Sequence, residues 1–483
     1  MLLSKFNCKN INTEKVAIPD EALFELPEKV LQFGTGVLLR GLPDYFIDKA
    51  NKQGIFNGRI VVVKSTDGGD AAAFDKQDGL YTICVRGIEG GKKQQENIVC
   101  SSISRVLSAK NEWNKILECA HNPQMKIIIS NTTEVGIELV QDDIRRYPPV
   151  SFPGKLLAFL YERYKAFAGS KQSGMVIIPT ELIVDNGKKL ESIVTELAYL
   201  NALEESFIDW LETSNTFCNS LVDRIVPGKP EKDLKKNIED EIGYTDELML
   251  ITEVYRLWAI EGDEETAKVL SFAQADKGVV IAPDINLFRE LKLRLLNATH
   301  TLSCAVAFLT GIATVKGAMD DKHMENFIAR LMQKEIASAI PMDASEEQKA
   351  EFAANCLDRF RNPFIEHQWL SITVQYTSKM NMRVVPVLLK HYSLQNSVPE
   401  NIATGFAAYI YFMKAVKVDA GKYYGSLHDN YYLINDAHAV YFYEKWQSTQ
   451  PALMAASVLK DTTLWGHDLA VLPGVAEAVQ EKI

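Results

Sequence analysis

The sequence lacks paired cysteines, an excess of basic residues and a long apolar run, and each absence excludes a class of protein. The seven cysteines stand singly, without CxxC or metal-ligand spacing, so we expect reduced thiols and no metal site. With 52 basic against 63 acidic residues, the formal net charge is -11. This charge argues against a general nucleic-acid-binding protein, because such proteins need a basic face.

The most apolar stretch, SCAVAFLTGIATV, is shorter than a membrane span and contains Ser, Thr and Gly, so it predicts a buried helix. The first residues, MLLSKFNCKNINTEK, include no continuous apolar segment typical of a signal peptide. We therefore expect a cytoplasmic protein with no membrane, nucleic-acid or obligate protein partner. A small anionic substrate remains compatible with the acidic chain, because a few local cations can override the global charge.

The pattern of apolar residues along the sequence changes near residues 276–285. Before this boundary, short β-branched runs alternate with helical stretches, which predicts an α/β domain with a mostly parallel, Rossmann-type sheet. After Pro283, helical periods dominate and β runs are few. At 483 residues the chain exceeds one ordinary core, so we expect domains at 1–280 and 281–483, the second mainly helical. The predicted strands are 29–33, 58–65, 80–86, 125–130 and 174–179.

A glycine turn follows the first predicted strand, in VLQFGTGVLLR. Gly34-Thr35-Gly36 stands between a strand and a helix, the context in which a dinucleotide fingerprint has meaning. Gly34 permits a tight turn, and Gly36 lets the backbone approach a pyrophosphate. The third glycine of the fingerprint is absent, since Leu39 stands in its place. Two glycines also fit an ordinary strand-helix turn, but the context favours a cofactor site.

The end of the second predicted strand bears on the choice of cofactor. An acidic side chain there binds the adenosine ribose and favours NAD, and Asp67 is the candidate. Asp67 lies further from the first glycine than the usual spacing of about 20 residues. Lys64 and Ser65 stand close by, and Lys64 could accept the 2′-phosphate of NADP. These residues alone leave both cofactors open.

The stretch LKLRLLNATHTL places Lys292, Asn297 and His300 among leucines. On a regular α-helix, at about 100° per residue, the three fall on one side of the helix. A solvated lysine, a capping amide or a core histidine would explain any one of them, but not all three together. Hydride exchange with a carbonyl needs a proton at the oxygen and donors for the developing alkoxide. Lysine can transfer that proton if its pKa falls from about 10.4 toward neutrality.

The spacing Lys-x4-Asn-x2-His resembles the mannitol dehydrogenase family of polyol-specific long-chain dehydrogenases. QFGTGVLLR is similar to the family's cofactor turn, SNTTEVG to its Thr-x-Glu segment, CNSLVDRIVP to its Asp-Arg-Ile block and YTSKM to its Ser-Lys-Met block. The resemblance implies an NAD-dependent oxidoreductase without a metal. The implied cofactor-binding residues are Phe33, Gly34, Thr35, Gly36, Asp67 and Asn131. It further implies Lys292 as acid/base, Asn297 as oxyanion donor, His300 and Asp223 at the substrate, Lys379 lining it, and Glu134 near a proton path.

One departure points to a subgroup of the family. Mannitol-type members carry Cys-Asp-Asn before an Asn-Gly pair, and this first Asn supplies a second oxyanion donor. Here Leu182 stands at that position, ahead of Asn186-Gly187, as in the members that reduce sugar acids. A substrate carboxylate needs a cation in a buried site, and Arg361, Lys379 and Arg383 are candidates. We expect Lys379 or Arg361 to bind it, in a small sugar-acid substrate.

Three other interpretations remain. A polyol dehydrogenase of the same family would prefer a neutral sugar. A 6-phosphogluconate or hydroxyacid dehydrogenase also places Lys and Asn on a helix, but with Lys-x3-Asn spacing. A non-catalytic nucleotide sensor would keep the fold without turnover, although the intact set of Lys292, Asn297 and His300 argues against it.

Overall fold

The computed structural model describes residues 1–65, 71–132, 136–428 and 430–483. The chain divides into two compact units. The first unit comprises Met1–Gly87 and Lys93–Ile285, and the second comprises Ile88–Lys92 and Asn286–Ile483.

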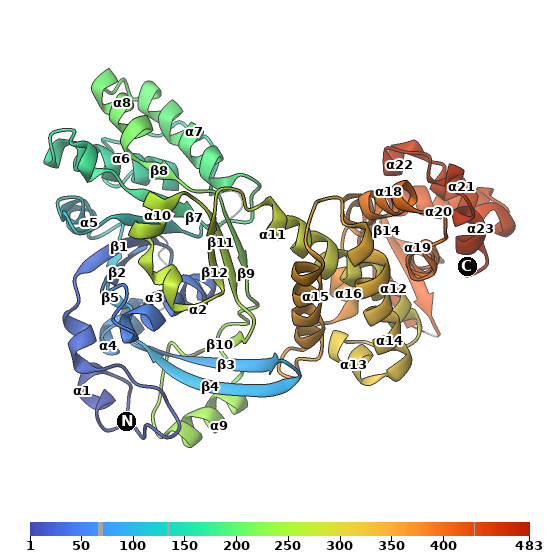
Figure 1. Ribbon diagram of the computed structural model, residues 1–483, viewed down its shortest axis with the longest axis horizontal. Helices are drawn as coiled ribbons and strands as arrows, with labels where there is room; N and C mark the ends of the chain where they lie inside the picture. The colour runs from blue at the N-terminus through green and yellow to red at the C-terminus, as the bar shows by residue number, and fades with distance from the viewer. Residues whose placement is uncertain (66–70, 133–135, 429) are drawn as a thin grey trace. The chain divides into compact units, whose positions relative to one another are not determined.

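A six-stranded parallel sheet forms the centre of the first unit, in the order β5-β2-β1-β6-β7-β8 (Figure 1). The order changes direction between β1 and β6, and in such open sheets ligands bind at the carboxyl ends of the strands at this point. The predicted Rossmann-type sheet is therefore confirmed. Its strands are β1 (Glu28–Phe33), β2 (Arg59–Lys64), β5 (Ile103–Ser108), β6 (Ile127–Ser130), β7 (Val176–Pro179) and β8 (Thr216–Phe217).

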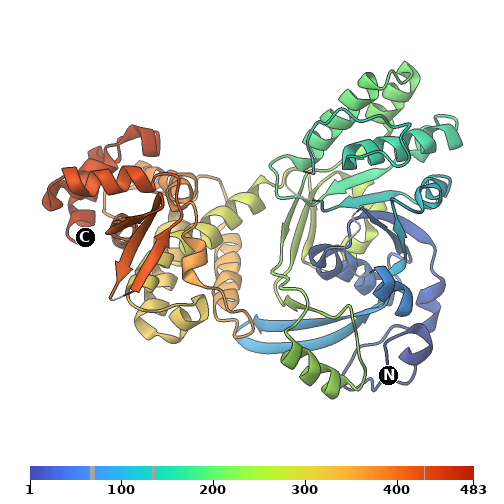
Figure 2. The ribbon, with the colours of Figure 1, turned by 180° about the vertical axis from the view of Figure 1, so that it is seen from behind.

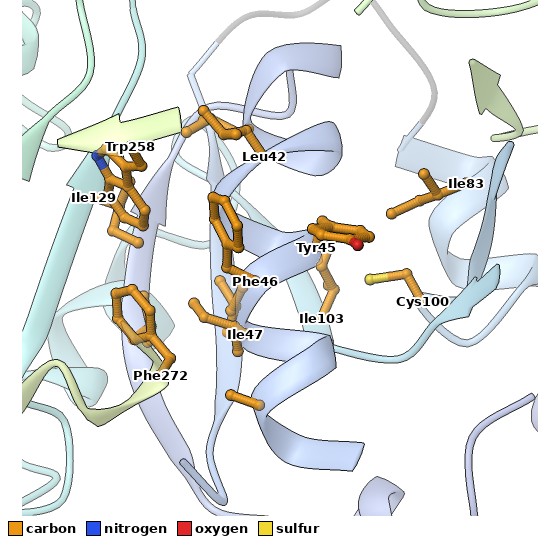
Figure 3. Packing of buried hydrophobic residues seen from close by; sticks show 14 of the residues in the cluster. Leu42, Tyr45, Phe46, Ile47, Ile83, Cys100, Ile103, Ile129, Trp258 and Phe272 are labelled. Atoms are coloured by element: carbon orange, nitrogen blue, oxygen red, sulfur yellow. The ribbon is translucent and has the colours of Figure 1, made fainter. Parts of the chain in front are cut away.

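Alternate residues of the central strands enter two different cores, because successive side chains of a strand point to opposite faces. Val30, Ile60 and Val62 pack with α3 (Pro43–Lys52) on one face. Figure 3 shows Phe46 and Ile47 of α3 in this core, with Trp258 stacked on Phe272 at 5.5 Å between ring centroids. The opposite face is covered by α5 (Trp113–Cys119), α6 (Phe152–Ala166), α7 (Asn186–Leu200) and α8 (Glu205–Ser214).

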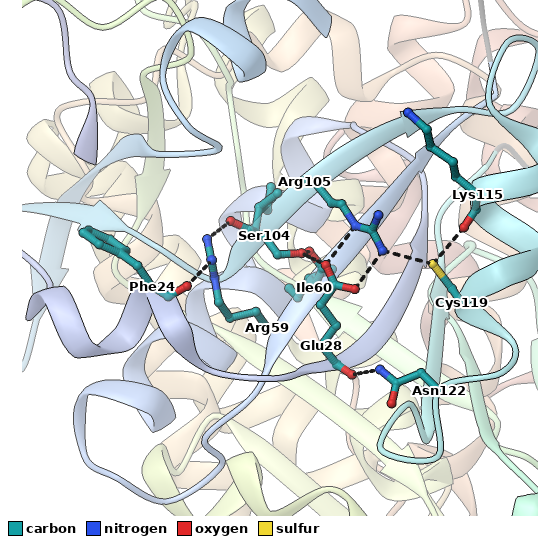
Figure 4. Close-up of polar contacts among 10 residues, drawn as sticks. Phe24, Glu28, Arg59, Ile60, Ser104, Arg105, Lys115, Cys119 and Asn122 are labelled. Atoms are coloured by element: carbon teal, nitrogen blue, oxygen red, sulfur yellow. Dashed lines mark hydrogen bonds and ion pairs between the residues drawn. The ribbon is translucent and has the colours of Figure 1, made fainter. Parts of the chain in front are cut away.

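Polar contacts join the amino ends of β1, β2 and β5 (Figure 4). Arg105 donates from Nε and Nη2 to the two oxygens of Glu28, both at 2.9 Å, and Ser104 donates to the same carboxylate at 2.8 Å. Arg59 donates from Nη1 to the carbonyl oxygen of Phe24 at 2.7 Å. The bidentate geometry fixes strand register at this end of the sheet and leaves the carboxyl ends free for a ligand.

The predicted strand at 80–86 does not join the main sheet. It forms β3 (Tyr81–Glu89), which pairs in parallel with β10 (Leu250–Glu253) and lies beside β4 (Lys92–Cys100) in a separate sheet. A third sheet contains β9 (Ser220–Asp223), β11 (Leu257–Glu261) and β12 (Val279–Ala282). The remaining helices of this unit are α1 (Lys5–Cys8), η1 (Glu21–Glu25), α2 (Val37–Gly41), α4 (Ala71–Lys76), η2 (Lys171–Ser173), α9 (Lys232–Ile242), α10 (Glu264–Val269) and η3 (Ser271–Ala275).

The second unit is mainly helical, as predicted. It also contains a three-stranded antiparallel sheet, β13 (Lys417–Asp419), β14 (Lys422–Leu427) and β15 (Asn430–Ile434), which the sequence analysis missed; Figure 2 shows it beside α20. Its helices are α11 (Asn286–Leu291), η4 (Lys292–Ala298), α12 (Thr299–Leu309), α13 (Val315–Asp320), α14 (Lys322–Arg330), η5 (Leu331–Ile336), η6 (Ala337–Ala339), α15 (Glu346–Phe360), α16 (Trp369–Ile372), α17 (Tyr376–Lys379), η7 (Met380–Val384), α18 (Val385–Leu394), α19 (Glu400–Phe412), α20 (Ala439–Ser448), η8 (Pro451–Leu453), α21 (Met454–Leu459), α22 (Thr462–Trp465), η9 (Leu469–Val471) and α23 (Val475–Gln480).

The apolar stretch SCAVAFLTGIATV begins inside α12, where most of its side chains are buried. Among the described residues, no helix has both the length and the apolar character needed to cross a membrane. All seven cysteines are buried and none forms a disulfide.

Candidate functional site

The glycine turn lies at the carboxyl end of β1, between this strand and α2. Gly34 has a φ of +126°, a conformation that side chains rarely adopt, and its N–H donates to the carbonyl of Val63 at 3.0 Å. A Cβ at Gly34 would lie 3.0 Å from the carbonyl oxygen of Asn131 and from Leu39. Gly34 is therefore required by the turn itself.

Gly36 has a different role from Gly34. It is the N-cap of α2 with φ -61° and ψ 154°, a conformation open to any residue, and a Cβ there would meet nothing within 4 Å. The backbone is thus exposed at the position where a dinucleotide pyrophosphate approaches in a Rossmann turn. The open space fits the predicted cofactor. Phe33, also predicted at this site, is fully buried against Phe152 with ring centroids 5.2 Å apart.

We expect Gly36→Ala to leave the melting temperature unchanged and to weaken NADH binding at least about tenfold, because the added methyl occupies the open space. Gly34→Ala is the matched comparison. It should lower the melting temperature as well, since a residue forced into a rarely populated backbone region costs about 1–3 kcal/mol. Thermal unfolding and NADH fluorescence titration separate the two effects. Unchanged NADH affinity in Gly36→Ala would contradict this role of the turn.

The next strand of the sheet, β6, places Asn131 beside the turn. Two hydrogen bonds fix Asn131. Its N–H donates to the carbonyl of Phe33 in β1 at 3.2 Å, and its Nδ2 donates to the carbonyl of Thr180, directly after β7, at 3.1 Å. Glu181 is a buried carboxylate here that the sequence analysis missed. It accepts from the N–H of Thr132 at 2.8 Å, and burial raises its pKa.

Two predicted residues of this unit, Asp67 and Glu134, lie outside the described residues, so their predicted roles stay predictions. Lys64, the competing cofactor residue, is the last residue of β2 and is largely buried. Asp223 ends β9 and is also buried. Arg224 is held by backbone carbonyls, donating from Nη1 to Gly41 O at 2.6 Å.

A buried carboxyl group, Asp44, lies beneath the glycine turn. Gln32 donates from Nε2 toward the carbonyl of Gly34 at 3.4 Å and toward Asp44 at 3.5 Å, and Tyr81 donates to Asp44 at 3.2 Å. Burial raises the pKa of Asp44 to about 7, with Asp48 contributing and Gln32, Tyr81 and Arg40 opposing. Asp44 therefore takes up a proton on folding below neutral pH.

Asp44→Asn should gain stability relative to wild type as the pH rises from 5 to 8. The folded protein holds the Asp44 proton up to about pH 7, whereas the unfolded chain releases it near its ordinary value of 3.8. The native state therefore binds more protons between these values, and rising pH destabilises it. From pH 5 to the folded pKa of about 7, at roughly 1.4 kcal/mol per unit, wild type should lose about 3 kcal/mol relative to Asp44→Asn. Chemical unfolding of both proteins across this range measures it; parallel curves would contradict the assignment.

In the second unit, the predicted catalytic residues lie on one continuous helix formed by α11, η4 and α12. Lys292 begins η4, Asn297 is near its end, and His300 belongs to the first turn of α12. The expectation of regular α geometry is wrong, because η4 is a π-helix. Hydrogen bonds in a π-helix join residues five apart, so Asn297 lies about one helical turn beyond Lys292. π-Helical segments occur frequently at functional sites.

His300 is enclosed by aromatic rings. Its imidazole stacks on Phe360 with centroids 4.2 Å apart and an interplanar angle of 9°, and it meets Trp369 edge-on at 5.9 Å. Burial, with His367, Arg359 and Arg383 nearby, lowers the pKa of His300 well below 6.5. The imidazole is therefore neutral at neutral pH and can exchange a hydrogen bond with a hydroxyl group.

Several buried polar atoms around His300 have no hydrogen-bond partner among the described residues. They are Thr299 Oγ1, His300 Nε2, Ser303 Oγ, Trp369 Nε1 and Arg383 Nε. Buried polar groups are nearly always hydrogen-bonded, so such a concentration needs an explanation. A polar ligand that binds beside the helix would explain it.

The cations predicted to bind a substrate carboxylate differ in their surroundings. Arg361 donates from Nη2 to Glu325 at 2.8 Å and lies 3.5 Å from Asp358, so its charge already has carboxylate partners. Lys379 donates to the carbonyl of Ile372 at 2.8 Å, and burial and Arg383 lower its pKa.

The Asn-Gly pair of the first unit has a structural role. Asn186 donates to the carbonyls of Pro179, Glu181 and Ser220, at 3.0 to 3.1 Å, and accepts from two backbone N–H groups. Leu182, where mannitol-type members have the second oxyanion donor, is 64% exposed. The structure thus gives Leu182 no donor role.

Comparison with known proteins supports the class defined by this fold, a dinucleotide-binding α/β unit followed by a helical unit. Residues 28–273 match the mannitol dehydrogenase Rossmann domain, and residues 284–483 match the mannitol dehydrogenase C-terminal domain. The chain belongs to the mannitol dehydrogenase family. The predicted family and oxidoreductase class are confirmed.

Two relatives that match over most of their length are both named altronate oxidoreductase. The chain is 38% identical over 459 residues to the altronate oxidoreductase of Bacillus subtilis, covering 94% of this chain and 92% of that protein. It is 36% identical over 469 residues to the altronate oxidoreductase of Halalkalibacterium halodurans, covering 95% and 91%.

Solved structures agree on the fold. Pseudomonas fluorescens mannitol 2-dehydrogenase, in a ternary complex with NAD and D-mannitol, matches 100% of this chain and 96% of its own at 21% identity, with a TM-score of 0.67. A substrate-free D-sorbitol dehydrogenase matches 100% and 97% at 19% identity, with a TM-score of 0.76.

Proposed function

We propose that this protein is an NAD-dependent altronate oxidoreductase, which interconverts D-tagaturonate and D-altronate. The observation that carries the proposal is the similarity of nearly the whole chain to altronate oxidoreductases, at 35–38% identity. Both units of the protein are covered, so the cofactor turn and the helix with Lys292 are included. The reaction belongs to hexuronate metabolism, and we propose that it occurs in the cytoplasm.

The cofactor is NAD, whose reduced form, NADH, would supply the hydride for reduction when it is bound. Gly34 and Gly36 provide the turn for its pyrophosphate, and Asn131, the residue directly after β6, lies beside the turn. We propose that Asp67 selects NAD by binding the adenosine ribose, as the family resemblance implies. Comparison of kcat/KM for NADH and NADPH tests this role, and a preference for NADPH would assign the selection to Lys64.

We propose that Lys292 donates the proton to the carbonyl oxygen of the keto sugar acid and removes it in the reverse direction. The Asn297 amide donates a hydrogen bond to the same oxygen as negative charge develops there. The neutral His300 binds an adjacent hydroxyl group, which would satisfy its buried Nε2. The π-helical step between Lys292 and Asn297 supports a shared target for the two side chains.

A substrate panel tests the proposal directly. NADH oxidation is followed with D-tagaturonate, D-fructuronate and D-fructose under the same conditions. Tagaturonate should give the highest kcat/KM, and fructose should be poor because a site built for a carboxylate is left unpaired. Fructuronate as the better substrate would make the protein a fructuronate reductase, and fructose as the better substrate would make it a polyol dehydrogenase.

A further inference from the structure

Arg383 is a partly buried cation near His300. It belongs to η7, a π-helix that contacts η4 and α12. Its Nη1 donates to Thr301 Oγ1 at 3.1 Å, one residue beyond His300. Its Nε is buried and has no hydrogen-bond partner among the described residues. The guanidinium is thus placed at the helix with part of its donor capacity unused.

The backbone that carries Arg383 is fixed to the same helix. Arg294 of η4 donates from Nη1 to the carbonyls of Met382 at 2.6 Å and Arg383 at 2.9 Å. Thr301 in turn donates to the carbonyl of Asn297 at 2.8 Å. The two π-helices are therefore held together from both sides, and the guanidinium has a defined position relative to Asn297 and His300.

Arg383 differs from the neighbouring arginines in having no carboxylate partner among the residues that the structure describes. Arg361 is paired with Glu325 and Arg294 with Glu290. A partly buried guanidinium without an anion has lost some of its hydration without compensation, and this burial lowers the pKa of Arg383. An anionic ligand would compensate for this loss.

We propose that Arg383, and not Arg361 or Lys379, binds the carboxylate of the sugar-acid substrate and selects an acid over a neutral sugar. The inference rests on the proposed function and names the residue that determines its substrate class. The planar guanidinium offers two donors to a carboxylate, which a lysine cannot match. The reacting carbonyl then lies toward Lys292 and Asn297, and the carboxylate lies toward η7.

A purely structural role for Arg383 makes a different prediction. If the side chain only joined η7 to α12 through Thr301, its loss would disturb the helix with Asn297 and His300 and would impair every substrate equally. A role in carboxylate binding impairs only substrates that carry the charge. The comparison of a keto sugar acid with its neutral primary amide isolates this difference, because the two share every other group.

The test measures kcat and KM for tagaturonate and for tagaturonamide with NADH. Arg383→Met should raise KM for the acid at least about 10²-fold, the usual scale for leaving one member of a buried charge pair alone, while the amide changes only a few-fold. Arg383→Lys should recover part of the selectivity, and it keeps the test decisive if the Met variant does not fold. Thr301→Val removes the joining hydrogen bond but keeps the cation, so selectivity should persist.

Arg361→Met is the matched control, and it should retain the acid preference. Equal losses for acid and amide in the Arg383 variants, or selectivity lost in Arg361→Met instead, would overturn the inference. The proposed function fails by a separate result, namely a wild-type protein that prefers fructose to tagaturonate. If the wild-type protein reduces tagaturonate but its preference for the acid does not depend on Arg383, the inference is refuted and the proposed function stands.

Discussion

Lys292→Ala is expected to lower kcat for tagaturonate reduction at least about 10²-fold, the usual contribution of a positioned acid or base. The substrate oxygen must gain a proton as hydride arrives, and alanine offers none. KM for NADH should change little, since the cofactor turn belongs to the first unit of the protein. Steady-state kinetics with both substrates varied gives the two constants separately.

The control for this variant is Lys334→Ala. Lys334 is an exposed lysine in another π-helix, η5, so its replacement removes the same side chain from the same type of backbone. It should leave kcat unchanged. The pH dependence of kcat should change in Lys292→Ala but not in the control. Near-wild-type turnover of Lys292→Ala, with an unchanged melting temperature, would exclude Lys292 as the proton-transfer group.

The sequence predicted β1, β2, β6 and β7 of the main sheet because these central strands are largely buried on both faces, and it missed the edge strands β5 and β8, which are partly exposed. The central strands are short continuous runs of Val and Ile, as in IVVV and IIIS, which stand out from their surroundings. The run at 80–86, LYTICVR, is also rich in apolar residues, yet it pairs with β10, far along the chain. Composition predicts that a segment forms a strand but not which strand it pairs with, so the separate sheet could not be predicted.

The candidate site was predicted by residue type and not by geometry. The spacing of Lys292, Asn297 and His300 identified the helix, but no local pattern distinguishes a π-helix from an α-helix here. The π-helix packs against η7, and its Arg294 bonds to the carbonyls of Met382 and Arg383, which are distant in the sequence, so local patterns do not report these contacts. Likewise, nothing in the sequence separates Arg361, which is paired with Glu325, from Arg383, which is partly buried and bonded to Thr301.

Asn297→Ala should lower kcat by about 10²–10³-fold, the effect of removing one donor from an oxyanion site. Its amide is the donor expected at the oxygen where negative charge develops. Mannitol-type members have a second donor at the position of Leu182. Leu182 is exposed and its side chain is a hydrocarbon, so stabilisation of the oxyanion should depend more strongly on Asn297. The measurement is kcat for tagaturonate reduction, together with its pH dependence.

The pH dependence separates Asn297 from Lys292. Asn297 does not titrate, so Asn297→Ala should reduce kcat at every pH and keep the shape of the wild-type profile, whereas Lys292→Ala should alter that shape. Asn396→Ala serves as the control, because Asn396 is an exposed asparagine of the same unit. The backbone carbonyl of Asn297 accepts from the Thr301 hydroxyl, and this bond survives replacement of the Asn297 side chain, so the helix should remain intact. Asn297→Ala with less than a tenfold loss of kcat and an unchanged melting temperature would show that the oxyanion is stabilised by another group.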